Sequence, residues 1–179
     1  MNCWKTIRVT QEFGAFRLIF FSLCTMLFSF LLYFLFISSL VGPHEFVHVR
    51  FITIISSIVL LIAIHKLLHL IPIWLCGKKA TITIKFVLFL PLIGVKLNEP
   101  IARNLYVTSL LTPAILITMA CALLSIMFPS YLAVISIITS IHFGLIFFDV
   151  IYLTYLIKAP KKSLVEDHSE GFHILTKAS

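Results

Sequence analysis

The sequence predicts an all-α membrane protein with four transmembrane helices and a short β-hairpin between the second and the third. Of its 179 residues, 60% are hydrophobic and only 12% are charged, and the mean hydropathy is +1.10. A soluble domain is about half apolar and a quarter charged. The apolar residues form four blocks, each as long as the roughly 20 residues that a helix needs to cross a bilayer. Too few polar residues remain for a second globular domain, so residues 1–179 are expected to form a single integral membrane domain.

The four spans are expected at residues 18–41, 51–75, 105–128 and 131–157. Gly42-Pro43 separates the first two blocks and Pro129-Ser130 makes a tight turn between the last two, because glycine and proline interrupt helices. The first block is too long for the core of a signal peptide and has no small-residue cleavage site after it. We therefore expect it to remain in the membrane as an anchor.

Three segments outside the spans are expected on one side of the membrane. Residues 1–17 form a short amphipathic lead along the inner membrane surface, and residues 158–179 form a polar cytoplasmic tail that is partly ordered at best. Within residues 80–97, apolar residues at 82, 84 and 86 alternate with polar residues at 81, 83 and 85, which is typical of a β-strand. Pro91 and Gly94 permit a turn there, so a β-hairpin is expected that lies at the inner face or dips into it.

The basic residues indicate how the spans are oriented. Of the 14 lysines and arginines, all but Arg50 and Lys66 fall in the lead, the hairpin region and the tail, which a four-span chain places on one side. They are Lys5, Arg8, Arg17, Lys78, Lys79, Lys85, Lys96, Arg103, Lys158, Lys161, Lys162 and Lys177. Lysine and arginine accumulate on the cytoplasmic side of membrane proteins, so both termini are expected in the cytoplasm of a multi-pass cell-membrane protein in contact with the lipid bilayer. The net charge of +7 reflects this pattern, and no nucleic-acid binding is expected.

The four cysteines give no sign of a disulfide framework or of a cysteine zinc site. They are far apart and form no CxxC pair, and two of them lie inside apolar blocks.

Five ionisable residues lie inside the predicted spans, where they are costly and therefore candidates for function. They are His65, Lys66 and His69 in the second span and His142 and Asp149 in the fourth. At about 1.5 Å per residue, His65, His69 and Asp149 lie roughly 15, 9 and 12 Å from the inner ends of their spans. Histidines four residues apart share a helix face and can bind one metal ion. Asp149 on an adjacent helix would complete a three-ligand site that leaves a fourth position for water.

Two further residues lie near this layer. His142 precedes Asp149 by seven residues, so it lies near the same helix face but roughly 10 Å further out. We expect it to pack or to form a hydrogen bond rather than to bind the metal. Pro113 lies roughly 12 Å from the inner end of the third span and is expected to loosen that helix near the site.

Together these features resemble one bacterial family of small membrane proteins of unknown function, described as "putative zincin peptidase". The resemblance covers nearly the whole chain and includes HKLLH at residues 65–69, GKK followed by a hairpin, Thr112-Pro113, Asp149 and PKKSLVEDH at residues 160–168. The family is distantly similar to site-2 intramembrane proteases. The resemblance implies an HExxH motif at residues 65–69, with zinc bound by His65, His69 and Asp149.

One position departs from this pattern, because Lys66 stands where the motif has glutamate. The glutamate acts as the general base on the water that the metal activates. A lysine could do this only if it were strongly desolvated, and its cationic form would repel the metal. The sequence therefore predicts a metal-binding, site-2-protease-like protein with impaired or absent peptidase activity, possessing no catalytic residue of the usual kind. Such a protein would bind transmembrane segments of other membrane proteins without cutting them.

Three other interpretations remain open. Lys66 and Asp149 would form a buried ion pair in a purely structural protein, with the histidines hydrogen-bonding across helices. His65, Lys66 and Asp149 would form a proton relay in a small transporter, although the chain lacks the internal repeats common in transporters. The third interpretation is an active peptidase with an unusual base.

A second histidine pair matches HExxH literally, including the glutamate, at residues 44–48. It follows Gly42-Pro43, where a helix would only be starting, and no third ligand is evident in the short loop between the last two spans. We interpret this segment as a polar turn at the outer membrane edge.

Overall fold

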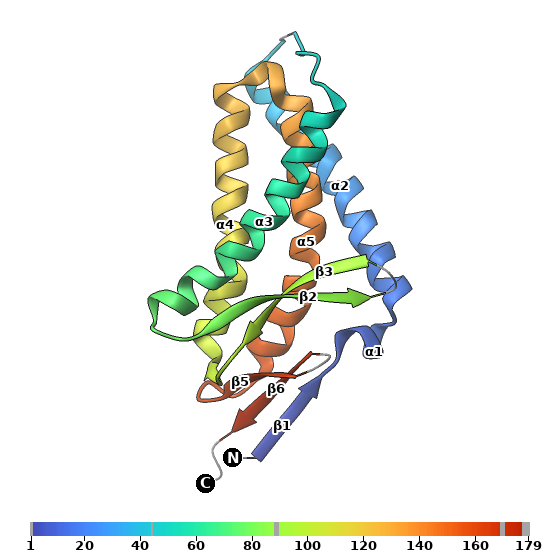
Figure 1. Ribbon diagram of the computed structural model, residues 1–179. Helices are drawn as coiled ribbons and strands as arrows, with labels where there is room; N and C mark the ends of the chain where they lie inside the picture. Colours follow the sequence, from blue (N-terminus) through green and yellow to red (C-terminus); the bar gives the residue numbers. More distant parts are fainter. Residues whose placement is uncertain (1, 44, 88–89, 169–170, 177–179) are drawn as a thin grey trace. The chain divides into compact units, whose positions relative to one another are not determined.

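Four long helices dominate the computed structural model, which describes residues 2–43, 45–87, 90–168 and 171–176 (Figure 1). The helices are α2 (Ala15–Val41), α3 (Phe51–Leu75), α4 (Arg103–Met127) and α5 (Leu132–Lys158). A short helix α1 (Val9–Phe13) precedes α2, and the 3-10 turn η1 (Pro129–Tyr131) joins α4 to α5. All four long helices are long and apolar enough to cross a membrane. Each of their ends lies within three residues of the predicted span, so the predicted fold class is confirmed.

The predicted hairpin is also confirmed. Strands β2 (Ala80–Val87) and β3 (Leu90–Leu97) pair antiparallel, from Ala80 opposite Leu97 to Val87 opposite Leu90. The expected position of its turn was wrong, because Pro91 and Gly94 lie within β3, opposite Phe86 and Thr83. Residues 88 and 89, between the two strands, lie outside the described residues.

A four-stranded sheet was not predicted, and it corrects the expectations for both ends of the chain. Its strands are β1 (Asn2–Ile7), β4 (Ile101–Ala102), β5 (Leu164–His168) and β6 (Gly171–Thr176), in the order β1-β6-β5-β4. The lead is therefore mainly a strand, and the tail is ordered as two strands as far as Thr176. The physical reason is mutual burial, because Ile7, Val165, Phe172 and Ile174 lose nearly all contact with solvent in this sheet.

The chain divides into two compact units. The first comprises Met1–Ala15, Lys66–Thr112 and Asp149–Ser179, and includes both sheets. The second comprises Phe16–His65 and Pro113–Phe148, and includes most of α2. Helices α3, α4 and α5 each contribute residues to both units. The expectation of a single membrane domain stays a prediction.

Within the second unit, α2 packs closely on α5. The Ser22 hydroxyl donates to the Gly144 carbonyl at 3.0 Å, and a side chain at position 144 would meet Met26. The glycine at position 144 therefore allows α2 and α5 to approach. Further along α2, the hydroxyl groups of Tyr33 and of Ser125 on α4 hydrogen-bond at 2.9 Å.

Helix α3 ends in a Schellman motif. The Lys78 N–H donates to the Ile73 carbonyl at 3.1 Å and the Gly77 N–H to the Trp74 carbonyl at 2.9 Å. Gly77 has a φ of 71°, a left-handed conformation that glycine adopts without steric cost. Beyond it, the Glu99 carboxylate accepts from the Lys78 ammonium at 3.0 Å and from the Lys79 N–H at 3.1 Å. These bonds define the end of the helix that carries His65 and His69.

The long helices expose much of their apolar surface. Large hydrophobic side chains with more than half of their surface exposed are frequent on α2, and include Phe16, Phe20, Leu27, Phe28 and Leu35. Contiguous apolar surface of this kind is unfavourable in water and suits contact with lipid. The four candidate spans thus indicate contact with a bilayer, as predicted.

Candidate metal centre

Helix α3 places two histidines on one buried face. His65 and His69 are four residues apart, so their side chains project on the same side, one turn apart. His65 is fully buried, and 4% of the surface of His69 is exposed. Polar rings buried in an apolar helix need hydrogen-bond partners, and the structure provides a different partner for each.

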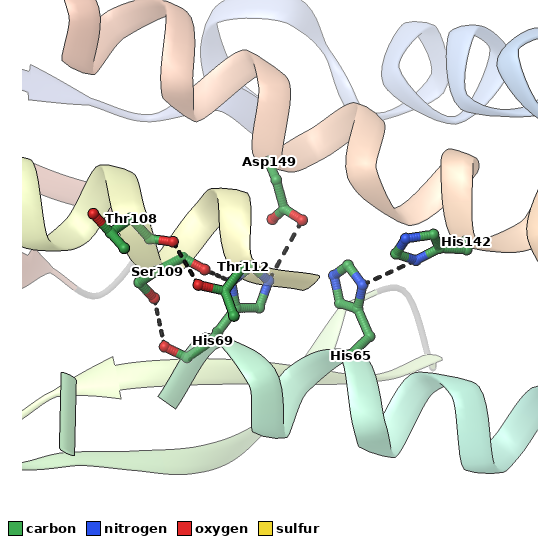
Figure 2. Close-up of polar contacts among 7 residues, drawn as sticks. All are labelled: His65, His69, Thr108, Ser109, Thr112, His142 and Asp149. Carbon is green, nitrogen blue, oxygen red and sulfur yellow. Dashed lines mark hydrogen bonds and ion pairs between the residues drawn. The ribbon is translucent and has the colours of Figure 1, made fainter. Parts of the chain in front are cut away.

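His69 is held by two hydrogen bonds with Ser109 of α4 (Figure 2). Its Nδ1 lies 2.8 Å from the Ser109 carbonyl oxygen, and the Ser109 hydroxyl donates to the His69 carbonyl at 2.5 Å. Because a carbonyl oxygen only accepts, Nδ1 must carry the proton. The other ring nitrogen, Nε2, lies 3.4 Å from Asp149 Oδ2. The ring orientation is therefore defined on both sides, and Nε2 is the nitrogen that faces the carboxylate.

Asp149 brings the negative charge to this centre. It lies on α5, and 7% of its surface is exposed. A buried carboxylate is strongly unfavourable unless a positive charge or a metal ion compensates for it. The charge of Asp149 can be compensated in two ways. Either His69 is protonated at Nε2, or a cation binds both Nε2 and the carboxylate.

His65 hydrogen-bonds with a second histidine, His142 of α5. Their Nδ1 atoms are 3.3 Å apart, and the rings meet edge to face with centroids 5.3 Å apart. A hydrogen bond between two ring nitrogens needs one nitrogen that carries a proton and one that does not, so one ring donates and the other accepts. The predicted hydrogen-bonding role of His142 is confirmed (Figure 2), although the sequence did not identify His65 as its partner.

His65, His69 and Asp149 form a group that could hold a metal ion. One ligand atom from each residue lies within 4.8 Å of the others, and His65 is one turn from His69 on α3. Two imidazoles and a carboxylate are ligands that zinc prefers in sites with an open fourth position. His69 also has the arrangement typical of a zinc ligand, in which one ring nitrogen donates to a carbonyl and leaves the other for the metal. The donor set therefore fits zinc.

Lys66 lies beside this group and is half-buried. At about 100° per residue, it projects roughly 80° around the helix axis from the middle of the two histidines. Among the described residues, the ion pair found at Asp149 is with His69, and none is found at Lys66. The structural interpretation based on a Lys66–Asp149 ion pair therefore has no support in the described part of the chain.

The literal HExxH segment at residues 44–48 is not part of a helix. Residues 45–50 form neither helix nor strand, and the side chains of residues 45–48 are exposed. The Val47 N–H donates to the Ser130 carbonyl at 3.0 Å, so this segment lies against the turn between α4 and α5. His44 lies outside the described residues. Residues 45–48 therefore do not form the helix that a zincin motif requires, and their interpretation as a polar turn at the outer membrane edge stays a prediction.

Fold and site together define a class, a helical protein with four candidate membrane spans and a His-His-Asp group that could hold a metal. Residues 58–164, more than half of the chain, match the model of the family described as "Putative zincin peptidase". The chain therefore belongs to this family, which confirms the resemblance seen in the sequence. The matched segment contains His65, His69 and Asp149. No curated protein and no solved structure matches the chain.

Proposed function

We propose that this chain is a zincin-like integral membrane protein that binds one zinc ion through His65, His69 and Asp149, with impaired or absent peptidase activity. The observation that carries the proposal is the buried His-His-Asp group, which lies in the segment matched to a zincin family. Ionisable groups on apolar helices are energetically costly, so a cluster of them is a candidate for a functional site.

Each residue has a distinct task in this proposal. His69 presents Nε2 because its Nδ1–H is bonded to the Ser109 carbonyl, and His65 adds a second imidazole from the preceding turn. Asp149 supplies the negative charge that offsets part of the charge of a divalent ion. Zinc, when bound, supplies Lewis-acid activation of water or of a carbonyl.

Lys66 limits what the centre can do. The residue after the first histidine is the general base in zincins, and a general base contributes about 10²–10⁴-fold to a rate. A protonated lysine has no lone pair to accept a proton, and its positive charge adds to that of the metal. Because Lys66 stands where the general base would be, the proposal is a protein that binds zinc without efficient peptide hydrolysis.

Topology and partners complete the proposal. Both termini lie in the cytoplasm, as the twelve basic residues on that side indicate. The protein then binds transmembrane segments of other membrane proteins near the metal centre without cutting them. Placement of both termini by cysteine labelling in intact cells tests the orientation.

Zinc content tests the proposal directly. Purified protein in detergent should contain about one zinc ion per chain, and H65A and H69A should each lose it, since the removal of one of three ligands leaves an incomplete site. His48→Ala is the matched control, because it removes a histidine of the exposed literal motif, and it should retain the zinc. A wild-type protein without stoichiometric zinc would show that the metal-binding proposal is wrong.

The transporter interpretation stays a prediction. The bond between His65 and His142 adds a further titratable group next to those that it invokes. A pH-dependent ion flux in proteoliposomes, absent in Asp149→Asn, would favour it over the zinc site.

A further inference from the structure

We propose that Pro113 is a positioning residue for the metal centre, because it frees the carbonyl that orients His69. This inference rests on the proposed function, in which His69 binds zinc through Nε2. It assigns a role to a proline that the sequence alone indicates only as a loosening of its helix.

The argument begins with the hydrogen bonds of α4. In an α-helix, the carbonyl of residue i accepts from the N–H of residue i+4. For Ser109 that donor would come from position 113, and proline has no N–H. Helix α4 nevertheless continues from Arg103 to Met127, so the Ser109 carbonyl lies within the helix without its usual donor.

Burial decides what replaces that donor. Ser109 is 1% exposed, and Pro113 is also fully buried, so bulk water cannot reach this carbonyl. Buried backbone carbonyls are nearly always hydrogen-bonded. His69 supplies the bond, with its Nδ1 at 2.8 Å from the Ser109 oxygen. The ring N–H of His69 on α3 therefore takes the place of the backbone N–H that is missing at Pro113 on α4.

The consequence for His69 is a fixed tautomer. With Nδ1 as the donor, the lone pair of the neutral ring is on Nε2, which faces Asp149 at 3.4 Å. A metal-binding histidine needs this arrangement, and partners that orient such a ring typically affect metal affinity by about 10–100-fold. Pro113 thus acts on the metal through Ser109 and His69 without touching it.

Pro113→Ala restores the N–H at position 113 and makes it compete for the Ser109 carbonyl. We expect zinc affinity, measured by competition with a chelator, to fall about 10–100-fold. We also expect the ¹⁵N NMR signals of the His69 ring in metal-free protein to shift from the Nδ1–H tautomer toward a mixture. Pro113→Gly restores the same N–H and provides a second variant if Pro113→Ala does not fold.

Two matched variants separate this effect from general damage. Pro72→Ala also removes a proline from the interior of a spanning helix, α3, but it does not restore a donor to Ser109, and it should leave the His69 tautomer unchanged. Ser109→Ala removes the hydroxyl that donates to the His69 carbonyl but keeps the carbonyl of residue 109. It should therefore retain the Nδ1–H tautomer.

Each outcome decides between specific claims. An unchanged His69 tautomer in Pro113→Ala overturns the inference, as does an equal change in Pro72→Ala. A changed tautomer with unchanged zinc affinity overturns the positioning role. If the wild-type protein binds no zinc, the proposed function is wrong, whereas the tautomer measurement in metal-free protein still tests the link between Pro113 and His69.

Discussion

The chain contains two histidine pairs with zincin spacing, and the structure treats them in opposite ways. The pair at residues 44–48 has the complete HExxH motif, and the pair at residues 65–69 has lysine in place of glutamate. Residues 45–48 of the first are exposed and outside any helix. His65 and His69 are buried on α3, with His142, Ser109 and Asp149 as partners. A motif carries metal chemistry only where a helix aligns its residues and neighbouring elements complete the site.

Backbone chemistry explains the difference. Gly42 has a φ of 75° and its N–H donates to the Ser38 carbonyl at 3.2 Å, which ends α2 just before the literal motif. Pro43 then prevents the helix from continuing. The second pair lies within the uninterrupted 25 residues of α3. Helix boundaries, rather than the match to a motif, separate the two pairs.

The largest effect should come from restoring the base of the buried pair. Lys66→Glu completes HExxH on α3, and a general base contributes about 10²–10⁴-fold, so cleavage of a transmembrane reporter should become measurable where the wild type shows little or none. Adding Glu45→Gln to this variant should not reduce the cleavage. Loss of cleavage with Glu45→Gln would reverse the assignment and make residues 44–48 the active motif.

The next effect concerns Asp149, the proposed third ligand beside the buried pair. Asp149→Asn keeps the shape of the side chain but removes its charge, so zinc affinity should fall by at least the roughly 10–100-fold seen when a mere orienting partner is lost. Asp167→Asn on β5 makes the same chemical change outside the centre. Equal losses in both variants would mean that overall charge, and not ligation, determines the affinity.

Two glycines, Gly144 of α5 and Gly42 just before the exposed pair, provide a comparison of stability. A methyl group at Gly144 of α5 would lie 2.4 Å from Met26 Cγ, and overpacking of this kind costs about 1–3 kcal/mol. Gly42 has open space around it but a positive φ, so Gly42→Ala should cost about 1 kcal/mol, because an L-residue is strained in the left-handed conformation. Unfolding in detergent micelles should therefore show a larger loss for Gly144→Ala. The opposite order would indicate that α2 and α5 do not pack as the structure describes.

Hydropathy and spacing were sufficient to predict the four helices, because each needs only its own run of apolar residues. Helical periodicity also places His65 and His69, two of the candidate ligands, on one face of their helix. The hairpin at residues 80–97 was recognisable because its alternation lies in one continuous segment. Its turn was misplaced, because Pro91 and Gly94 permit a turn but are paired within β3.

Features that depend on distant segments were not predicted. The sheet joins residues 2–7 to residues 164–176, and neither segment shows which partner it pairs with. The alternation of Phe172 and Ile174 with Gly171 and His173 was a signal for a strand in the tail, and the polar composition of the tail obscured it. Ser109 was missed because its role depends on α4 lying beside His69, although the spacing of four residues between Ser109 and Pro113 indicates a carbonyl without its helical donor.

The smallest effect should come from Glu99, which closes the loop that follows the helix of the buried pair. The Lys79 N–H, and then the Lys78 ammonium, lower the pKa of this carboxyl below its ordinary value of 4.5. A lowered pKa in the folded state adds stability above the pKa of the unfolded chain, and this contribution disappears as the pH falls through the folded value. The stability of the wild type should therefore decrease more than that of Glu99→Gln between about pH 6 and about pH 3. Lys78→Gln removes only the second donor, so it should retain most of the pH dependence. If Lys78→Gln abolished that dependence, the ammonium rather than the backbone N–H would be the main partner of Glu99.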